Sequence, residues 1–230
     1  MSKTLGIIGG LGTETSCSFC LNINTQVKKT QETQPHLIMD NVPISNTALN
    51  TIAHGGRSSE VEELLTNSVK RLNDSKADVI VIPCNTVHVS IDRLRELSSA
   101  PILSIIEETA KECEKRRLRK VGVLGSSLTI KEGLYSKELQ KCSIEVVIPN
   151  NTEQEFVSNC IIRIIHFNTT KEDKEKILEI IANLQAQGAE AIILGCTDLF
   201  LIVSSNDVSL PLIDSTKVLE NAAVKWLTLK

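Results

Sequence analysis

Apolar and polar positions follow one another in blocks that predict strands and helices in regular succession. Short, almost wholly apolar runs indicate buried parallel strands. These runs lie at Thr4–Gly9, His36–Asn41, Val79–Pro83, Pro101–Leu103, Lys120–Leu124, Glu145–Ile148, Ile192–Leu194 and Leu212–Ile213. Between them, apolar residues recur at helical spacing. The helices predicted in this way are Thr13–Lys29, Glu60–Ser75, Val87–Leu97, Ile105–Arg117, Leu134–Lys141, Glu153–His166, Lys171–Gln187 and Thr216–Leu227. This β-α-β succession is typical of parallel sheets with right-handed crossovers.

Two of the predicted strands lead into the same kind of ending. Ala77–Thr86 and Ala189–Asp198 each run through β-branched residues to a cysteine, Cys84 in the first and Cys196 in the second. A cysteine at the carboxyl end of a buried parallel strand lies where open α/β sheets bind their ligands. The glycine-rich stretch that begins at Gly6 also recurs, at a similar spacing, from Gly122. The sequence therefore predicts two similar α/β halves, each of which contributes one thiol to a shared cleft.

The expected fold is α/β, with two pseudo-symmetric Rossmann-like domains built on parallel sheets and an active site in the cleft between them. A chain of 230 residues is long enough for two domains of about 100 residues each. We expect residues 1–98 plus 214–230 to form the first domain and residues 99–213 the second.

Composition excludes several classes of function. A formal charge of −3 provides no basic field for nucleic acid and no polybasic membrane patch, and 3% aromatic residues leave little for stacking bases. Met1–Gly10 lacks the layout of a signal peptide, and no run approaches the roughly 20 apolar residues of a membrane span. Seven cysteines, an odd number, do not form a disulfide framework. We expect a cytoplasmic protein with reduced thiols.

Five ordered motifs resemble those of the aspartate/glutamate racemases over essentially the whole chain. They are Gly9–Gly12 (GGLG), Pro83–Thr86 (PCNT), Ile106–Thr109 (IEET), Gly125–Tyr135 and Gly195–Asp198 (GCTD). The resemblance implies racemisation of an amino acid, aspartate or glutamate in the first instance. It also implies no pyridoxal cofactor, no metal, and two thiols on opposite faces of the substrate's α-carbon. A homodimer is a further expectation from the same resemblance.

Two cysteines suit this chemistry because inversion removes the α-proton from one face and returns a proton to the other. Fixed groups on both faces act as base and acid and exchange these roles when the reaction reverses. A free thiol, with a pKa of about 8.5, is mostly protonated at neutral pH. The helix predicted after Cys84, with Asn85 and Thr86 at its start, would stabilise a thiolate there. His88 either tunes this thiol or only caps the helix.

The resemblance also assigns substrate contacts. It implies that the following residues face the amino acid: Gly10, Leu11, Gly12, Asn85, Thr86, Ser126, Thr129 and Thr197. Backbone N–H groups of the turn at Ser126 to Thr129 are expected to hold a carboxylate.

Two positions depart from the pattern of aspartate-specific members. Asn46 occupies the place of an arginine, and His166 occupies the place of a lysine. Asparagine lacks the charge and the bidentate geometry of arginine, so the substrate remains open although both residues are expected at the site. Two alternatives follow: an isomerase or decarboxylase that acts on a dicarboxylic acid, or a non-catalytic amino-acid-binding protein. The second is disfavoured because binding alone does not require a thiol on each face.

Overall fold

Two parallel four-stranded sheets form the framework of the computed structural model, which describes residues 3–229. The first sheet has the strand order β2-β1-β3-β4 and the second the order β6-β5-β7-β8. The strands of the two halves are therefore arranged in the same spatial order. The strands are β1 Thr4–Gly9, β2 His36–Asn41, β3 Val79–Val81, β4 Ile102–Leu103, β5 Lys120–Gly125, β6 Glu145–Val147, β7 Ala191–Gly195 and β8 Leu212–Asp214. This arrangement confirms the predicted pseudo-symmetric α/β fold.

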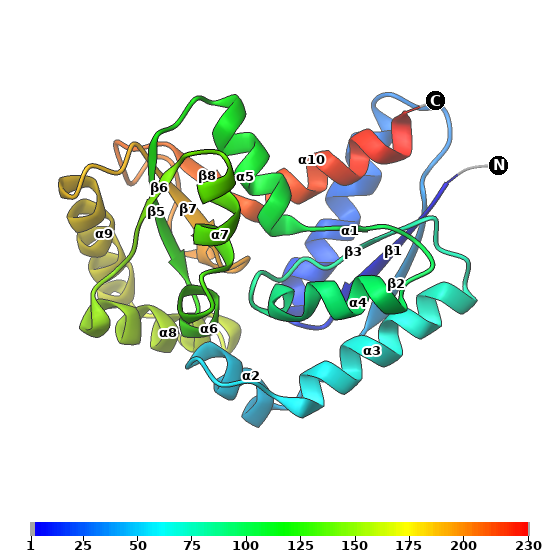
Figure 1. Cartoon of the computed structure of the whole chain (residues 1–230), viewed down its shortest axis with the longest axis horizontal. Helices are drawn as coiled ribbons and strands as arrows, with labels where there is room; N and C mark the ends of the chain where they lie inside the picture. The colour runs from blue at the N-terminus through cyan, green and yellow to red at the C-terminus, as the bar shows by residue number, and fades with distance from the viewer. Residues whose placement is uncertain (1–2, 230) are drawn as a thin grey trace.

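Helices cover the sheets and link their strands (Figure 1). They are α1 Thr13–Lys28, α2 Asn46–Ala53, α3 Ser59–Asp74, α4 Ile91–Leu97, α5 Ile105–Lys115, α6 Ser127–Lys131, α7 Leu134–Lys141, α8 Asn151–Ile165, α9 Lys171–Ala186 and α10 Ser215–Thr228, with short 3-10 helices η1 Thr86–Ser90 and η2 Leu199–Leu201. The sequence did not predict α2 and α6, and the first turn of the helix predicted at Val87 is η1. Among residues 3–229, no helix is both long and apolar enough to cross a membrane.

Strand burial explains why the strands read as continuous apolar runs. Every residue of β1 and of β7 is buried, because each strand has neighbours on both sides and helices on both faces. β2 lies at the edge of its sheet, and all its residues are half-buried or exposed. The central strands therefore anchor the loops that follow their carboxyl ends, and both cysteines of interest lie in such loops.

Local capping fixes the two helices at the far end of the second half. Asn150 with Glu153, and Thr170 with Asp173, form capping boxes at the starts of α8 and α9. Arg163 of α8 donates to both carboxylate oxygens of Asp173, which joins the two helices. Because α8 contributes to the pocket described below, these contacts hold one of its walls in place.

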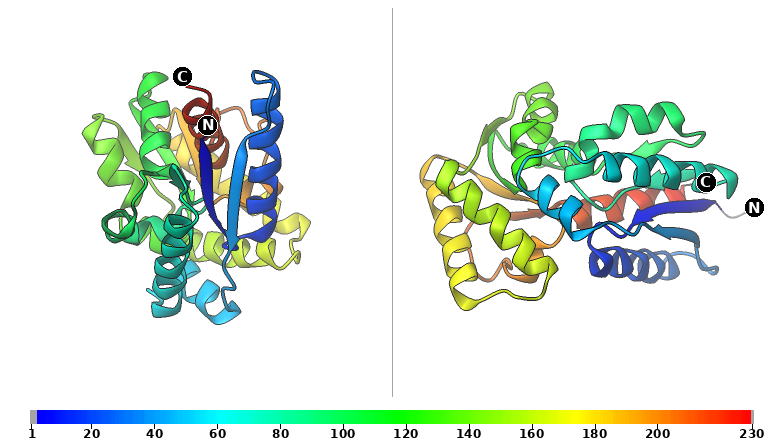
Figure 2. Two further views of the ribbon diagram at one scale, coloured as in Figure 1. Left: turned by 90° about the vertical axis from the view of Figure 1, so that its right-hand side faces the viewer. Right: turned by 90° about the horizontal axis from the view of Figure 1, so that it is seen from below.

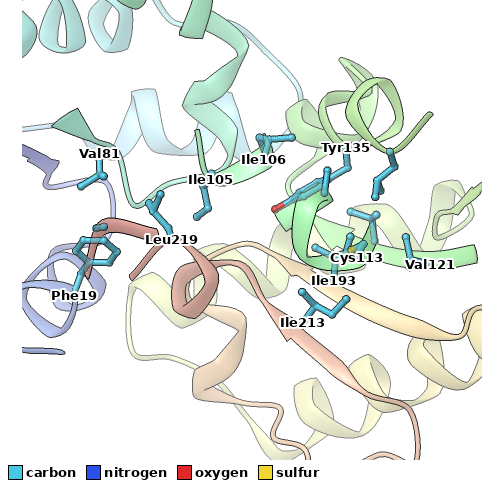
Figure 3. Packing of buried hydrophobic residues seen from close by; sticks show 14 of the residues in the cluster. Phe19, Val81, Ile105, Ile106, Cys113, Val121, Tyr135, Ile193, Ile213 and Leu219 are labelled. Atoms are coloured by element: carbon cyan, nitrogen blue, oxygen red, sulfur yellow. The ribbon is translucent and has the colours of Figure 1, made fainter. Parts of the chain in front are cut away.

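One apolar cluster, here called the shared core, extends through both halves (Figure 3), and two further clusters lie mainly within one half each. The shared core contains Phe19 and Leu219 together with Val121, Tyr135 and Ile193. α10 follows the last strand of the second sheet but packs against α1 and α5, and Figure 2 shows this red helix extending along the first half. β4 pairs with β3 and so joins the first sheet, although it lies beyond the boundary expected at residue 98.

Because the halves share this core, we expect them to unfold together. Leu219→Ala should reduce the free energy of unfolding by about 2–5 kcal/mol, since it leaves a cavity in a fully buried site. Urea unfolding followed by circular dichroism and by Trp226 fluorescence should give one coincident transition. Leu21→Ala, at a residue with 65% of its surface exposed, should change stability by no more than about 0.5 kcal/mol. Two separated transitions would contradict a shared core.

Candidate active site

Cys84 and Cys196 line one pocket of about 410 Å³ between the two halves. Cys84 lies three residues beyond β3 and Cys196 directly follows β7. β3 and β7 occupy equivalent places in the two sheets, so the thiols approach the pocket from pseudo-symmetric positions. All seven cysteines are free, and within residues 3–229 no three His, Cys, Asp or Glu side chains cluster as a metal site.

A buried chain of hydrogen bonds connects the loops that carry the thiols. The Tyr135 hydroxyl donates to Oδ1 of Asn85 over 2.5 Å, and Nδ2 of Asn85 donates to the Ser215 hydroxyl over 3.1 Å. That hydroxyl in turn donates to the carbonyl oxygen of Leu194 over 2.7 Å. Asn85 follows Cys84, and Leu194 lies two residues before Cys196. The chain therefore fixes one cysteine loop relative to the other.

Three hydroxyl groups form a second bridge between the halves. Thr86 Oγ1 lies 2.8 Å from Ser126 Oγ, which lies 3.0 Å from Thr129 Oγ1. Thr86 belongs to the first half and the other two residues to the loop after β5 and to α6. All three residues are buried. These contacts close the polar end of the pocket and orient the Thr86 and Ser126 hydroxyls that line it.

Opposing effects act on Cys84. Burial raises the pKa of its thiol to about 12, and the nearby Asp198 carboxylate adds to this rise. The backbone N–H groups of Val87 and Thr86 act in the opposite direction and lower the pKa. The predicted stabilisation by the turn after Cys84 is therefore present, but burial outweighs it, so this thiol is protonated at neutral pH.

Asp198 is the charged residue that affects the Cys196 thiol. Its Oδ2 lies 4.0 Å from the Cys196 sulfur, and its Oδ1 accepts a hydrogen bond from the Thr15 hydroxyl. Burial, and next the Asp198 charge, raise the pKa of Cys196 well above its usual value. Burial also raises the pKa of Asp198 itself. Sequence reasoning did not assign Asp198 a role, although the acidic residue that ends the GCTD motif was a signal for it.

His88 is structural in this arrangement. It is buried, its Nδ1 lies 2.8 Å from the Cys84 carbonyl oxygen, and its Nε2 accepts a hydrogen bond from the Ile105 N–H over 3.3 Å. These partners fix a neutral ring that donates through Nδ1. Burial lowers the pKa of His88 to about 4, with Arg95 nearby lowering it and Glu107 raising it. His88 thus joins the Cys84 loop to the start of α5.

The structure brings most of the predicted substrate contacts together. Five of them line the pocket with the cysteines: Leu11, Asn85, Thr86, Ser126 and Thr197. Gly10 and Gly12 line an adjoining cavity of about 670 Å³, here called the outer cavity, which shares Leu49, Ile165 and Asp198 with the pocket.

Three predicted contacts line neither the pocket nor the outer cavity. Thr129 lies behind Ser126 in the hydroxyl cluster. Asn46 is exposed at the first turn of α2, and His166 is exposed just after the end of α8. The N–H groups of Ser127 and Thr129, expected to hold a carboxylate, donate instead to side-chain hydroxyls of the protein.

Glycine is required at the turn that follows β1. Gly10 and Gly12 have φ angles of +90° and +117°. A Cβ on Gly10 would lie 2.2 Å from the carbonyl oxygen of Val42, and one on Gly12 would lie 3.2 Å from the carboxylate oxygens of Asp198. This turn therefore brings the start of α1 close to Asp198, where Thr15 donates to the carboxylate.

Sequence reasoning missed the apolar side of the pocket. This side is lined by Leu49, Ile52 and Ala53 of α2 and by Ile161 and Ile165 of α8. α2 leaves the first half and packs against α8 and α6 of the second (Figure 1). No motif marks these residues, because helical spacing of apolar residues is equally typical of a buried core.

Comparison with known proteins defines the class to which this fold and site belong. A family model described as Asp/Glu/Hydantoin racemase matches residues 8–223. The broad specificity amino-acid racemase RacX of Bacillus subtilis (strain 168) is 27% identical over 225 residues, which cover 96% of each chain. An aspartate racemase homologue from Pyrococcus horikoshii OT3 has a TM-score of 0.79 and 29% identity, with 100% of both chains covered.

A second solved structure, the aspartate racemase of Picrophilus torridus, has a TM-score of 0.80 at 26% identity and covers 98% of this chain and 94% of its own. The chain therefore belongs to the Asp/Glu/Hydantoin racemase family. The relatives named here are amino-acid racemases or a homologue of one, and racemases are isomerases, so the resemblance noted in the sequence is confirmed.

Removing the charge of Asp198 should make both thiols more acidic. In Asp198→Asn, the pH profile for alkylation of Cys84 and Cys196 by iodoacetamide should shift to lower pH, because the carboxylate raises the pKa of both. Mass spectrometry of the alkylated peptides separates these sites from the exposed Cys17. Asp207→Asn, the same substitution outside the pocket, serves as control. An unchanged profile in Asp198→Asn would contradict the electrostatic link.

Stability should depend on His88 in mildly acidic solution. Because the folded pKa lies below the usual 6.5, the unfolded chain binds the extra proton, so stability is lost as pH falls from 6.5 through 4. Between pH 7 and 4.5, the shifted pKa of His88 should lower the free energy of unfolding by about 2–3 kcal/mol, as measured by urea unfolding. His88→Asn should remove most of that loss, whereas His54→Asn, at an exposed histidine, should retain it. Equal pH dependence in both variants would contradict the assignment.

Proposed function

We propose that this protein is a pyridoxal-independent amino-acid racemase in which Cys84 and Cys196 are the two proton-transfer groups. The observation that carries the proposal is that the two thiols, each beyond the carboxyl end of the equivalent strand in its sheet, line the same pocket. A substrate α-carbon between them would present one face to each sulfur. One cysteine removes the α-proton as thiolate and the other supplies a proton as thiol.

Charge balance in the pocket suggests how a thiolate forms when substrate binds. Asp198 raises the pKa of both cysteines. A substrate ammonium group beside this carboxylate would offset its charge and so lower the pKa of the thiols. The N–H groups of Val87 and Thr86 already favour the thiolate of Cys84. Activation is thereby coupled to the presence of an amino acid, and the empty site keeps its thiols protonated.

The polar end of the pocket is suited to the substrate carboxylate. Asn85, Thr86, Ser126 and Thr197 supply an amide and hydroxyl groups there. Hydrogen bonds to the carboxylate stabilise the negative charge that develops when the α-proton leaves. We assign Thr129 a positioning role through Ser126, and Gly10, Leu11 and Gly12 the role of shaping the wall near Asp198. Asn46 and His166 are not assigned a substrate contact.

Cellular location and assembly stay predictions. Seven free thiols are consistent with a reducing compartment, which supports the cytoplasm. The homodimer suggested by the family resemblance can be tested by analytical ultracentrifugation. An amino acid is the partner that the site is proposed to bind.

The two-thiol mechanism predicts that neither cysteine is dispensable. With a panel of L- and D-amino acids in D₂O, the wild-type protein should exchange the α-proton and invert configuration without added cofactor, as followed by NMR and chiral chromatography. Cys84→Ser and Cys196→Ser should each reduce inversion by about 10²–10⁴-fold, the usual contribution of a positioned proton-transfer group.

Cys17→Ser, at an exposed cysteine of α1, should leave the rate unchanged. Inversion at the wild-type rate in either Cys84→Ser or Cys196→Ser would contradict the mechanism. Absence of exchange for every amino acid would favour the alternatives, a reaction on a dicarboxylic acid or binding alone.

A further inference from the structure

The two sides of the pocket differ in chemistry. The side at the strand ends carries the two cysteines, an amide group, hydroxyl groups and the Asp198 carboxylate. The part formed by α2 and α8 is apolar: it consists of Leu49, Ile52 and Ala53 of α2 together with Ile161 and Ile165 of α8. We call these five side chains the apolar wall. An α-carbon held between the thiols, with its ammonium and carboxylate groups on the polar side, would direct its side chain at this wall.

The apolar wall is a regular feature of two helices. Leu49, Ile52 and Ala53 are three and four residues apart, and Ile161 and Ile165 are four apart, so each set lies on one helical face. α2 packs against α8. The wall is therefore one continuous surface contributed by both halves, and Leu49 and Ile165 extend it into the outer cavity.

The charged side chains that line the pocket and the outer cavity have one sign. Of the described residues that line the pocket and the outer cavity, none is Lys, Arg or His, and the two ionisable carboxyl groups are Glu14 and Asp198. Arg57 lines a neighbouring cavity that shares Ile52 and Thr86 with the pocket, and it is paired with Glu132 over 3.1 Å. Asn46 lies three residues before Leu49, so helical spacing puts it on the same side of α2, and it is exposed. A substrate side-chain carboxylate that packed against the apolar wall would thus lose its hydration without gaining a cation.

Burying an uncompensated charge is much more costly than burying an aliphatic group. We propose that the substrate of this site is an α-amino acid with an uncharged aliphatic side chain, which packs against the apolar wall while its ammonium group faces Asp198. This inference rests on the proposed racemase function and replaces aspartate and glutamate as its expected substrates.

The test compares side chains on one protein. Exchange of the α-proton in D₂O is measured for both enantiomers of leucine, methionine, aspartate, glutamate and lysine. We expect kcat/KM for leucine or methionine to exceed that for aspartate and glutamate by at least about 100-fold, because of the unpaired charge. Equal or faster exchange of aspartate, glutamate or lysine, if it requires both cysteines, would overturn the substrate class and leave the two-thiol mechanism intact.

A variant tests whether the apolar wall sets this preference. Leu49→Lys places a cation on the wall and should shift the ratio of glutamate to leucine exchange upward by at least about 10-fold. Leu97→Lys adds the same charge on α4, outside the pocket, and should keep the wild-type ratio. No shift in Leu49→Lys, with the protein folded by circular dichroism, would contradict the role given to the wall.

Binding without turnover separates this inference from the proposed function. In the double variant Cys84→Ser/Cys196→Ser, saturation-transfer NMR should detect leucine but not aspartate at equal concentration. If the wild-type protein exchanges no amino acid yet this binding pattern holds, the racemase proposal fails and the ligand class stands. If aspartate binds as well as leucine, the ligand class is overturned whatever the activity.

Discussion

Asn85 is held at the polar end of the pocket by hydrogen bonds that reach into both halves of the molecule. Its carbonyl oxygen accepts from Tyr135 and its amide donates to Ser215, whose hydroxyl donates to the Leu194 carbonyl oxygen. A buried amide that lost these partners would remain unsatisfied at a cost of about 1–3 kcal/mol per group. The relative position of the two cysteine loops therefore depends on this chain, and with it the possibility of placing a thiol on each face of one carbon atom.

Burial gives this site its electrostatic character. The same desolvation that raises the pKa of Cys84 and Cys196 also raises the pKa of Asp198, whose charge raises the pKa of both thiols further. In such surroundings the incoming ligand is part of the charge balance. In the proposed mechanism its ammonium group offsets the carboxylate, and its side chain meets a surface with no cation among the described lining residues.

The halves are alike in topology but not in what they add around the cleft. The first half extends α2 across to α8, and this contact builds the apolar wall. α2 begins at a Ser45 cap, whose hydroxyl accepts from the Ala48 N–H and whose own groups donate to Glu60. The proposed side-chain selectivity would thus lie in an element that breaks the pseudo-symmetry, whereas the proposed proton-transfer groups lie in the elements that obey it.

The sequence by itself determined the strands, most helices and both thiols, because these depend on short-range patterns: buried β-branched runs, helical periodicity, and the position of Cys84 and Cys196 after equivalent strands. It missed α2 and α6, which are only eight and five residues long, and the place of α2 depends on packing with α8.

Only the tertiary structure decided which residues share the pocket, because those contacts join distant parts of the chain. Thr15 meets Asp198 from the opposite half, and His88 is neutral because its ring lies between the Cys84 carbonyl and the Ile105 N–H. For Asn46 and His166, motif position suggested a substrate contact, but their places at helix ends leave both exposed. Local sequence determines whether a segment forms a helix or a strand, and the packing of the two halves determines which residues that segment contacts.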